Sequence, residues 1–169
     1  MEAPVAITLN EKKLLDLFSS FKDGIITIDE NYVIDSVNPN ALKLLKLNVV
    51  MVRGKRLPSL FPSNQLNIEN FLQNVNSSLH YSDYRNFFPE YQRWFQFRAY
   101  PFKKEFSVFI KDITGQIQND QILALERDVH LMQATQASLT HMLEYLLTGL
   151  EKIFPGYHTG LLELSTSGK

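Results

Sequence analysis

Hydrophobic residues near the start of the chain recur at helical spacing. The pattern predicts a helix over residues 11–21, which Asn10 can cap, with the apolar stripe Leu14, Leu15, Leu17, Phe18 and Phe21. Two β-rich runs follow at residues 25–28 and 32–37, and Asp29 lies in the turn between them. This part of the chain therefore predicts a helix followed by a β-hairpin.

Helical and extended patterns alternate again through the middle of the chain. Asn38-Pro39 has the form of an N-cap followed by a proline, so a short helix is expected to about residue 45. A longer helix is predicted over 67–79 from the spacing of Ile68, Phe71, Leu72, Val75 and Leu79. Three strand candidates come next, at residues 81–88, 94–100 and 106–113. The order predicts an α+β fold with a five-stranded antiparallel sheet and helices on one face.

One long helix is expected after the last strand, from residue 114 to about 154. It carries apolar residues at alternating spacings of three and four, with Gln136 as the exception. The a and d positions of this seam are Ile122, Leu125, Val129, Met132, Gln136, Leu139, Leu143, Leu146, Leu150 and Ile153. Such a stripe predicts a parallel coiled coil and a homodimer, in which a polar a residue favours one register.

Composition narrows the possible functions. The 169 residues suggest one domain, or one domain with an appendage. The net charge of −1 argues against a nucleic-acid partner or attraction to an anionic membrane surface. The chain has no cysteine, which excludes disulfides, thiolate metal sites, thiol catalysis and photochemistry through a cysteinyl adduct. No signal peptide or membrane-spanning pattern is found, so we expect a cytoplasmic protein without membrane insertion.

Six short segments, in order, resemble the PAS domain family. They are residues 24–29, residues 32–34, Val37-Asn-Pro-Asn-Ala41, Arg53-Gly-Lys-Arg-Leu57 with Leu60-Phe-Pro62, Arg93-Trp-Phe with Tyr100-Pro101, and the closing Asp112-Ile-Thr114. Residues 143–156 and 161–164 further resemble the opening helix and strand of a GAF domain. The resemblance implies an arm and helix over 1–21, a PAS domain over 22–114, a signalling helix over 115–154 and a truncated GAF-like start over 155–169.

This resemblance implies a sensory and regulatory module of a bacterial signal-transduction protein rather than an enzyme. The signal would pass through the helix to a C-terminal output domain, such as a histidine kinase or a cyclase, that lies outside these residues. The junction of the last strand with the helix, at Asp112 and Thr114, is the expected point of transmission. In a rival interpretation of the seam, residues 143–154 pack on an absent GAF sheet and only 122–139 pair with a partner.

A PAS domain encloses its ligand site between the sheet and the helices. The candidates are all apolar: Ile26, Ile28, Ala41, Leu44, Leu45, Phe71, Val75, Phe95, Phe97, Val108 and Ile110. They favour a filled core over a ligand site, and if a ligand binds it should be small and apolar. We expect no cofactor and a colourless protein. The other sheet face should carry Trp94, Tyr100 and Phe109, which the apolar stripe of the first helix could cover within the chain or from a partner.

Two alternatives use histidines. A haem or flavin sensor would need a ligand such as His80, but His80 falls in a turn. The dimerisation region of a histidine kinase would need phosphorylation on His130, but no acidic residue and proline follow it at short spacing. His130, His141 and His158 are too scattered to predict a metal site.

Overall fold

The computed structural model describes residues 11–78 and 80–160, and the chain divides into two compact units between Ile113 and Thr114. The first unit holds every strand that the described residues form. Its elements are α1 (Glu11–Ser20), β1 (Gly24–Ile28), β2 (Ile34–Val37), α2 (Pro39–Leu44), α3 (Val49–Val52), the 3-10 helices η1 (Leu57–Leu60) and η2 (Pro62–Asn64), α4 (Gln65–Ser78), β3 (Ser82–Phe88), β4 (Arg93–Phe102) and β5 (Glu105–Asp112).

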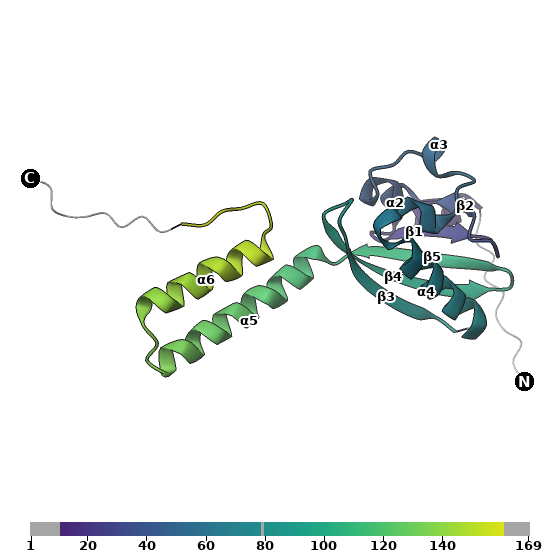
Figure 1. Ribbon diagram of the computed structural model, residues 1–169. Coiled ribbons are helices and arrows are strands. Elements are labelled where there is room, and N and C mark those ends of the chain that lie inside the picture. The colour runs from purple at the N-terminus through teal and green to yellow at the C-terminus, as the bar shows by residue number, and fades with distance from the viewer. Residues whose placement is uncertain (1–10, 79, 161–169) are drawn as a thin grey trace, which may run out of the picture. The chain divides into compact units, whose positions relative to one another are not determined.

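The five strands form one antiparallel sheet in the order β2-β1-β5-β4-β3. Helices α2 and α4 lie on one face of this sheet (Figure 1). The predicted α+β architecture is confirmed, and the predicted strands agree with the observed ones to within two residues at each end. The strand that comes last in the sequence is the central one.

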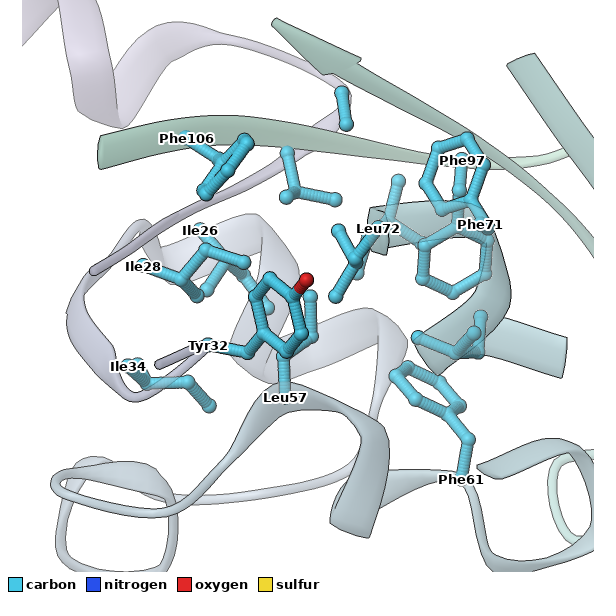
Figure 2. Packing of buried hydrophobic residues seen from close by; sticks show 14 of the residues in the cluster. Ile26, Ile28, Tyr32, Ile34, Leu57, Phe61, Phe71, Leu72, Phe97 and Phe106 are labelled. Atoms are coloured by element: carbon cyan, nitrogen blue, oxygen red, sulfur yellow. The ribbon is translucent and has the colours of Figure 1, made fainter. Parts of the chain in front are cut away.

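The core lies between the helices and the inner face of the sheet. Alternate residues of β4 and β5 point into it, because successive side chains of a strand face opposite sides. Phe95 and Phe97 on β4 and Val108 and Ile110 on β5 are fully buried there. Figure 2 shows Ile26, Ile28 and Ile34 and the rings of Phe61, Phe71 and Phe97 converging on this space.

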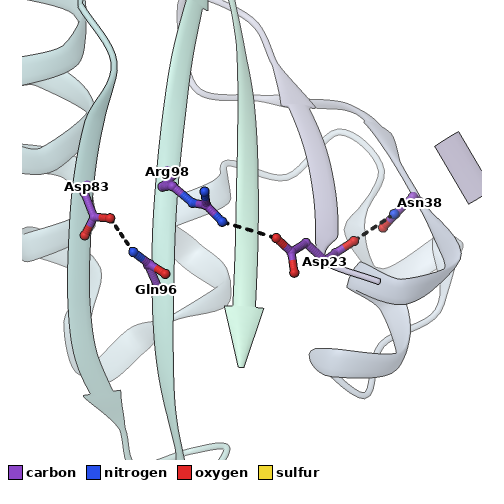
Figure 3. A network of polar contacts seen from close by, with 5 residues as sticks. All are labelled: Asp23, Asn38, Asp83, Gln96 and Arg98. Atoms are coloured by element: carbon purple, nitrogen blue, oxygen red, sulfur yellow. Dashed lines mark hydrogen bonds and ion pairs between the residues drawn. The ribbon is translucent and has the colours of Figure 1, made fainter. Parts of the chain in front are cut away.

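The side chain of Asn38 connects α1, β1 and α2 through hydrogen bonds. Its side-chain oxygen accepts hydrogen bonds from the backbone N–H of Ile25 (2.9 Å) and of Ala41 (2.8 Å), so it caps α2 and holds β1 at once. Its amide nitrogen donates to the carbonyls of Phe18 (3.2 Å) and Asp23 (3.1 Å). The N-cap role predicted for Asn38 is confirmed, and Figure 3 shows its link to Asp23.

Asp29 is confirmed as the turn residue of the first hairpin. Its carboxylate accepts from the backbone N–H groups of Asn31 (2.9 Å) and Val33 (2.8 Å). This is the local hydrogen bonding that makes aspartate favourable in turns.

The second unit is a helical hairpin, so the expectation of one continuous helix over 114–154 is wrong. Helix α5 (Thr114–Ala134) ends, a short turn follows, and α6 (Leu139–Ile153) packs back along α5. Gln136 adopts a left-handed conformation (φ 58°). The N–H groups of Gln136 and Ala137 donate to the carbonyls of Gln133 (3.1 Å) and Met132 (2.9 Å), which is the Schellman arrangement that ends a helix.

The apolar seam is therefore divided between two antiparallel helices of one chain. Leu125 of α5 is buried against Gly149 of α6, and the hydroxyl of Tyr145 donates to Asp128 (2.9 Å). Gln136 lies in the turn and is not an a position, and Leu139 is the largely exposed first residue of α6. The remaining seam residues are half-buried, apart from the buried Ile153; they are Ile122, Val129, Met132, Leu143, Leu146 and Leu150.

Several expectations lie outside the described residues: the arm over 1–9, the cap at Asn10 and the strand over 161–164. Within the described part of the chain, no helix is both long enough and apolar enough to cross a membrane.

Candidate functional site

The interior of the first unit is filled by aromatic rings. The ring of Phe61 lies 5.1 Å from that of Phe97, 5.2 Å from that of Phe88 and 5.8 Å from that of Tyr91, in tilted or edge-to-face arrangements. Such pairs contribute about 0.5–1.5 kcal/mol each beyond their burial. The space between α4 and β4 is therefore occupied by protein side chains.

Ten of the residues proposed from sequence to line a ligand site lie in this single buried cluster. They are Ile26, Ile28, Ala41, Leu45, Phe71, Val75, Phe95, Phe97, Val108 and Ile110. Leu44 does not belong to it: this side chain is half-buried and lies against Gly24 at the start of β1. The reason is the helical period, which turns Leu44 away from the face shared by Ala41 and Leu45.

A polar edge borders the aromatic interior and was not foreseen from the sequence. The side-chain oxygen of the buried Asn64 accepts a hydrogen bond from Asn86 (2.7 Å), which also donates to the hydroxyl oxygen of Tyr84 (2.8 Å). The ring of Tyr84 in turn lies 5.7 Å from that of Phe71. The alternation along β3 places Tyr84, Asn86 and Phe88 on the inner face, and this is the signal that would have predicted the edge.

Two tyrosine hydroxyls at the margin of the core have raised pKa values. Burial, with a smaller contribution from Glu90, raises the pKa of Tyr91 to about 12. Its hydroxyl donates to the carbonyl of Leu60 (2.9 Å). Burial also raises the pKa of Tyr32, and the guanidinium of Arg56, 5.8 Å from the ring centre, opposes that shift. Both hydroxyls therefore stay protonated at neutral pH.

The end of β5 is anchored to β4. Arg93 forms an ion pair with Asp112, and the backbone N–H of Ile113 donates to the carbonyl of Trp94 (2.9 Å). Ile113 is buried, and α5 begins at Thr114, the next residue. The two residues predicted to form the signal junction thus flank a single buried position between strand and helix.

The outer face of the sheet is a mixed aromatic and polar surface. Tyr100 is exposed and stacks on Tyr81 (5.5 Å), while Phe109 contacts Tyr100 edge-to-face (5.4 Å). Arg98 pairs with Asp23 (3.4 Å), as Figure 3 shows. A shallow groove of about 300 Å³ is lined here by Phe21, Asp23, Arg98, Tyr100 and Phe109.

The stripe predicted for the first helix covers this surface only in part, through Phe21 at the groove. Leu14, Leu15 and Leu17 of α1 are themselves exposed. Trp94 alternates with the buried residues of β4, as expected for the outer face, and it is half-buried because it packs on Phe87 (5.8 Å). The stripe predicted for the first helix is therefore available for contact.

The histidines considered from the sequence lie apart from the interior. His80 is exposed in the bend before β3, and His130 is exposed on α5.

The family described as PAS fold matches residues 18–118. The chain belongs to the PAS family. This match spans the whole sheet and the first five residues of α5. No curated protein matches the sequence.

Solved structures share the PAS fold at low sequence identity. An RNA-binding light-oxygen-voltage receptor has a TM-score of 0.59 and 16% identity, over 76% of this chain and 40% of that one. The PAS domain of the Cronobacter turicensis RpfR quorum-sensing receptor, in complex with C12:0, has a TM-score of 0.50 and 18% identity, over 56% of this chain and 97% of that one. A sensory box sensor histidine kinase from Vibrio cholerae has a TM-score of 0.47 and 15% identity, over 60% of this chain and 89% of that one. At 16% and 18% identity, the first two of these likenesses describe the fold alone.

Proposed function

We propose that the chain is a sensory and regulatory module whose PAS domain passes a change in its interior along β5 into α5, and from there to an output domain. The observation that carries the proposal is the path of the chain. Val108 and Ile110 of β5 contribute to the buried cluster, and only Ile113 separates β5 from α5. A shift of the strand reaches the helix through the backbone, without an intervening loop. The GAF-like continuation inferred from residues 143–164 belongs to this proposal as the start of the next domain.

The Arg93–Asp112 pair gives the proposal a specific test. Phe97→Leu perturbs the packing of the interior but leaves a large apolar side chain in place. The response is measured as the rate of amide hydrogen exchange in the first turns of α5. We expect Phe97→Leu to change exchange in α5, and Asp112→Ala to abolish that response while the sheet stays folded. Asp83→Ala is the matched control, because it removes a partly exposed carboxylate from β3, a strand that does not pair with β5. An unchanged response in Asp112→Ala would remove the junction from the proposal.

A small apolar molecule is the ligand class that this interior would accept. The buried cluster is apolar, and the polar edge formed by Asn64, Asn86 and Tyr84 could face one polar end group. The RpfR domain, which has the same fold, was solved with C12:0. Native mass spectrometry with dodecanoate tests this part. We expect no haem or flavin absorption band, and such a band surviving dialysis would contradict the apolar-ligand proposal.

Self-association is the second part of the proposal. It is supported by the exposed apolar side chains of α1 and by the aromatic groove beside Tyr100. Because the seam is divided between α5 and α6, the outer sheet face is now the stronger candidate for the contact. Light scattering on a size-exclusion column should show a homodimer that Tyr100→Glu converts to a monomer. If Leu139→Asp on α6 breaks the dimer instead, the contact lies on the helical hairpin, and a monomeric parent chain would refute both.

A further inference from the structure

The basic residues of the PAS domain are unevenly distributed. Residues 36–68 contain five of the 17 basic residues of the chain and none of its 18 acidic residues. The five are Lys43, Lys46, Arg53, Lys55 and Arg56. The net charge of −1 argued against an anionic partner. It is the sum of a positively charged segment and a negatively charged remainder of the chain.

An exposed apolar helix lies in the middle of this segment. Val49, Val50 and Met51 of α3 are 52%, 89% and 51% exposed. Figure 1 shows α3 at the edge of the PAS domain, away from the sheet. An exposure of 89% for Val50 requires a convex tip, because a groove or a flat surface would cover more of the side chain.

This tip is held in place by ordered backbone. Val52, the last residue of α3, is buried, and Asn48 caps the helix by accepting from the N–H of Met51 (2.9 Å). The carbonyl of Lys55 accepts from the N–H of Ile34 (2.9 Å) on β2. The apolar side chains are thus presented on a fixed support.

Four of the five basic residues of this segment are free to meet an anionic surface. Arg56 is engaged by Glu69 (2.8 Å). Lys43, Lys46, Arg53 and Lys55 are exposed, and none of them forms an ion pair with a residue that the structure describes. Asp35, which follows Ile34 on the adjoining strand, contributes one carboxylate against these four charges.

We propose that this basic surface segment, residues 43–55, docks on the anionic headgroups of a lipid bilayer. Lys43, Lys46, Arg53 and Lys55 would lie among the headgroup phosphates, while Val49, Val50 and Met51 enter the boundary between headgroups and acyl chains. Apolar side chains on a convex tip, with two exposed basic residues before it and two after it in the sequence, match this boundary, since lysine and arginine reach phosphate level while their neighbours are buried. A protein partner would need a concave acidic site. The proposal goes beyond sensing, because it places the PAS domain at a surface.

Co-sedimentation of the full chain with vesicles tests the proposal. Vesicles of phosphatidylcholine with about 30% phosphatidylserine should bind the chain in low salt, and vesicles of phosphatidylcholine alone should not. Each basic residue near an anionic surface is worth roughly fivefold in binding, so Lys46→Glu with Arg53→Glu should weaken binding by at least about 25-fold. Val50→Ser with Met51→Ser should weaken it by about tenfold or more.

Matched variants separate this surface from general charge. Lys111→Glu with Lys152→Glu changes the net charge equally, at exposed positions on β5 and α6. Leu66→Ser removes an exposed leucine (68%) from α4. Both should bind as the parent does, with circular dichroism confirming that every variant is folded. Equal loss in these controls, or no binding to the anionic vesicles, would overturn the proposal. Retention on immobilised polyglutamate without vesicle binding would also overturn it, in favour of an acidic protein partner.

Discussion

Removal of the Asn38 side chain should lower the free energy of unfolding of the PAS domain by a large amount for so small a side chain. All four hydrogen-bonding positions of its amide are used, and they join the end of α1, the start of β1 and the first turn of α2. The side chain is fully buried. Asn38→Ala leaves two backbone N–H groups and two backbone carbonyls without these partners.

The magnitude follows from what water can replace. The N–H of Ala41 loses a helix cap, which costs about 1 kcal/mol, and the N–H of Ile25 is left buried without a partner, which costs about 1–3 kcal/mol. The carbonyls of Phe18 and Asp23 are only part-buried and recover some hydration. We therefore expect a loss of about 3 kcal/mol, a large part of the 5–15 kcal/mol typical of a domain. Asn38→Asp keeps the acceptor and should lose about 2 kcal/mol through the two donors.

Trp94 makes the measurement specific. It is the only tryptophan of the chain and lies on β4, so its fluorescence during urea unfolding reports the PAS domain and not the helical hairpin. Asn48→Ala is the control: it removes an exposed N-cap with a single hydrogen bond and should cost about 1 kcal/mol or less. If Asn38→Ala costs no more than Asn48→Ala, the four bonds do not act together and the reasoning fails.

Three further predictions concern Gln136, Gly149 and Tyr91. Gln136→Gly should stabilise the hairpin by about 1 kcal/mol, because glycine adopts the left-handed conformation without strain; amide exchange in α6 should slow. Gly149→Val should cost about 2 kcal/mol, because even one added carbon would lie 2.4 Å from Leu125, and the same exchange experiment should show Leu125→Ala relieving the loss. Because the pKa of Tyr91 is raised in the folded state, its protonated hydroxyl contributes to the free energy of unfolding. This contribution is fully present below pH 10 and is lost as the pH rises towards 12. Urea midpoints at pH 9 and pH 11 should therefore fall more for the parent chain than for Tyr91→Phe.

The sheet and its buried face could be predicted because both depend on local alternation. Phe95, Phe97, Val108 and Ile110 alternate with polar or half-exposed neighbours, and that pattern alone assigns them to the core. The polar edge could be predicted only in part, because alternation along β3 assigns Asn86 to the inner face but does not identify its partner Asn64. It depends on bringing together residues 22 positions apart, which only the packing of η2 against β3 achieves.

The turn after α5 was not predicted from the sequence, for a different reason. Residues 135–138 contain no glycine or proline, and the apolar seam keeps its spacing across them. Helical periodicity does not distinguish a helix that continues from two helices that fold together, since both bury one apolar stripe. Ser138, whose hydroxyl accepts from the N–H of His141 (3.3 Å), was the available signal of a new helix start.

The strand order of the PAS domain has a consequence for how the chain is made. During synthesis the N-terminal segments emerge first, and the β1–β2 and β3–β4 hairpins can form as they appear. Neither hairpin touches the other in the finished sheet, because β5 lies between them. Until the ribosome has released residues 105–112, both hairpins present an open strand edge, the feature that invites pairing with other chains. Insertion of β5 closes both edges in one step, so the strand proposed to carry the signal is also the one whose arrival completes the nascent domain.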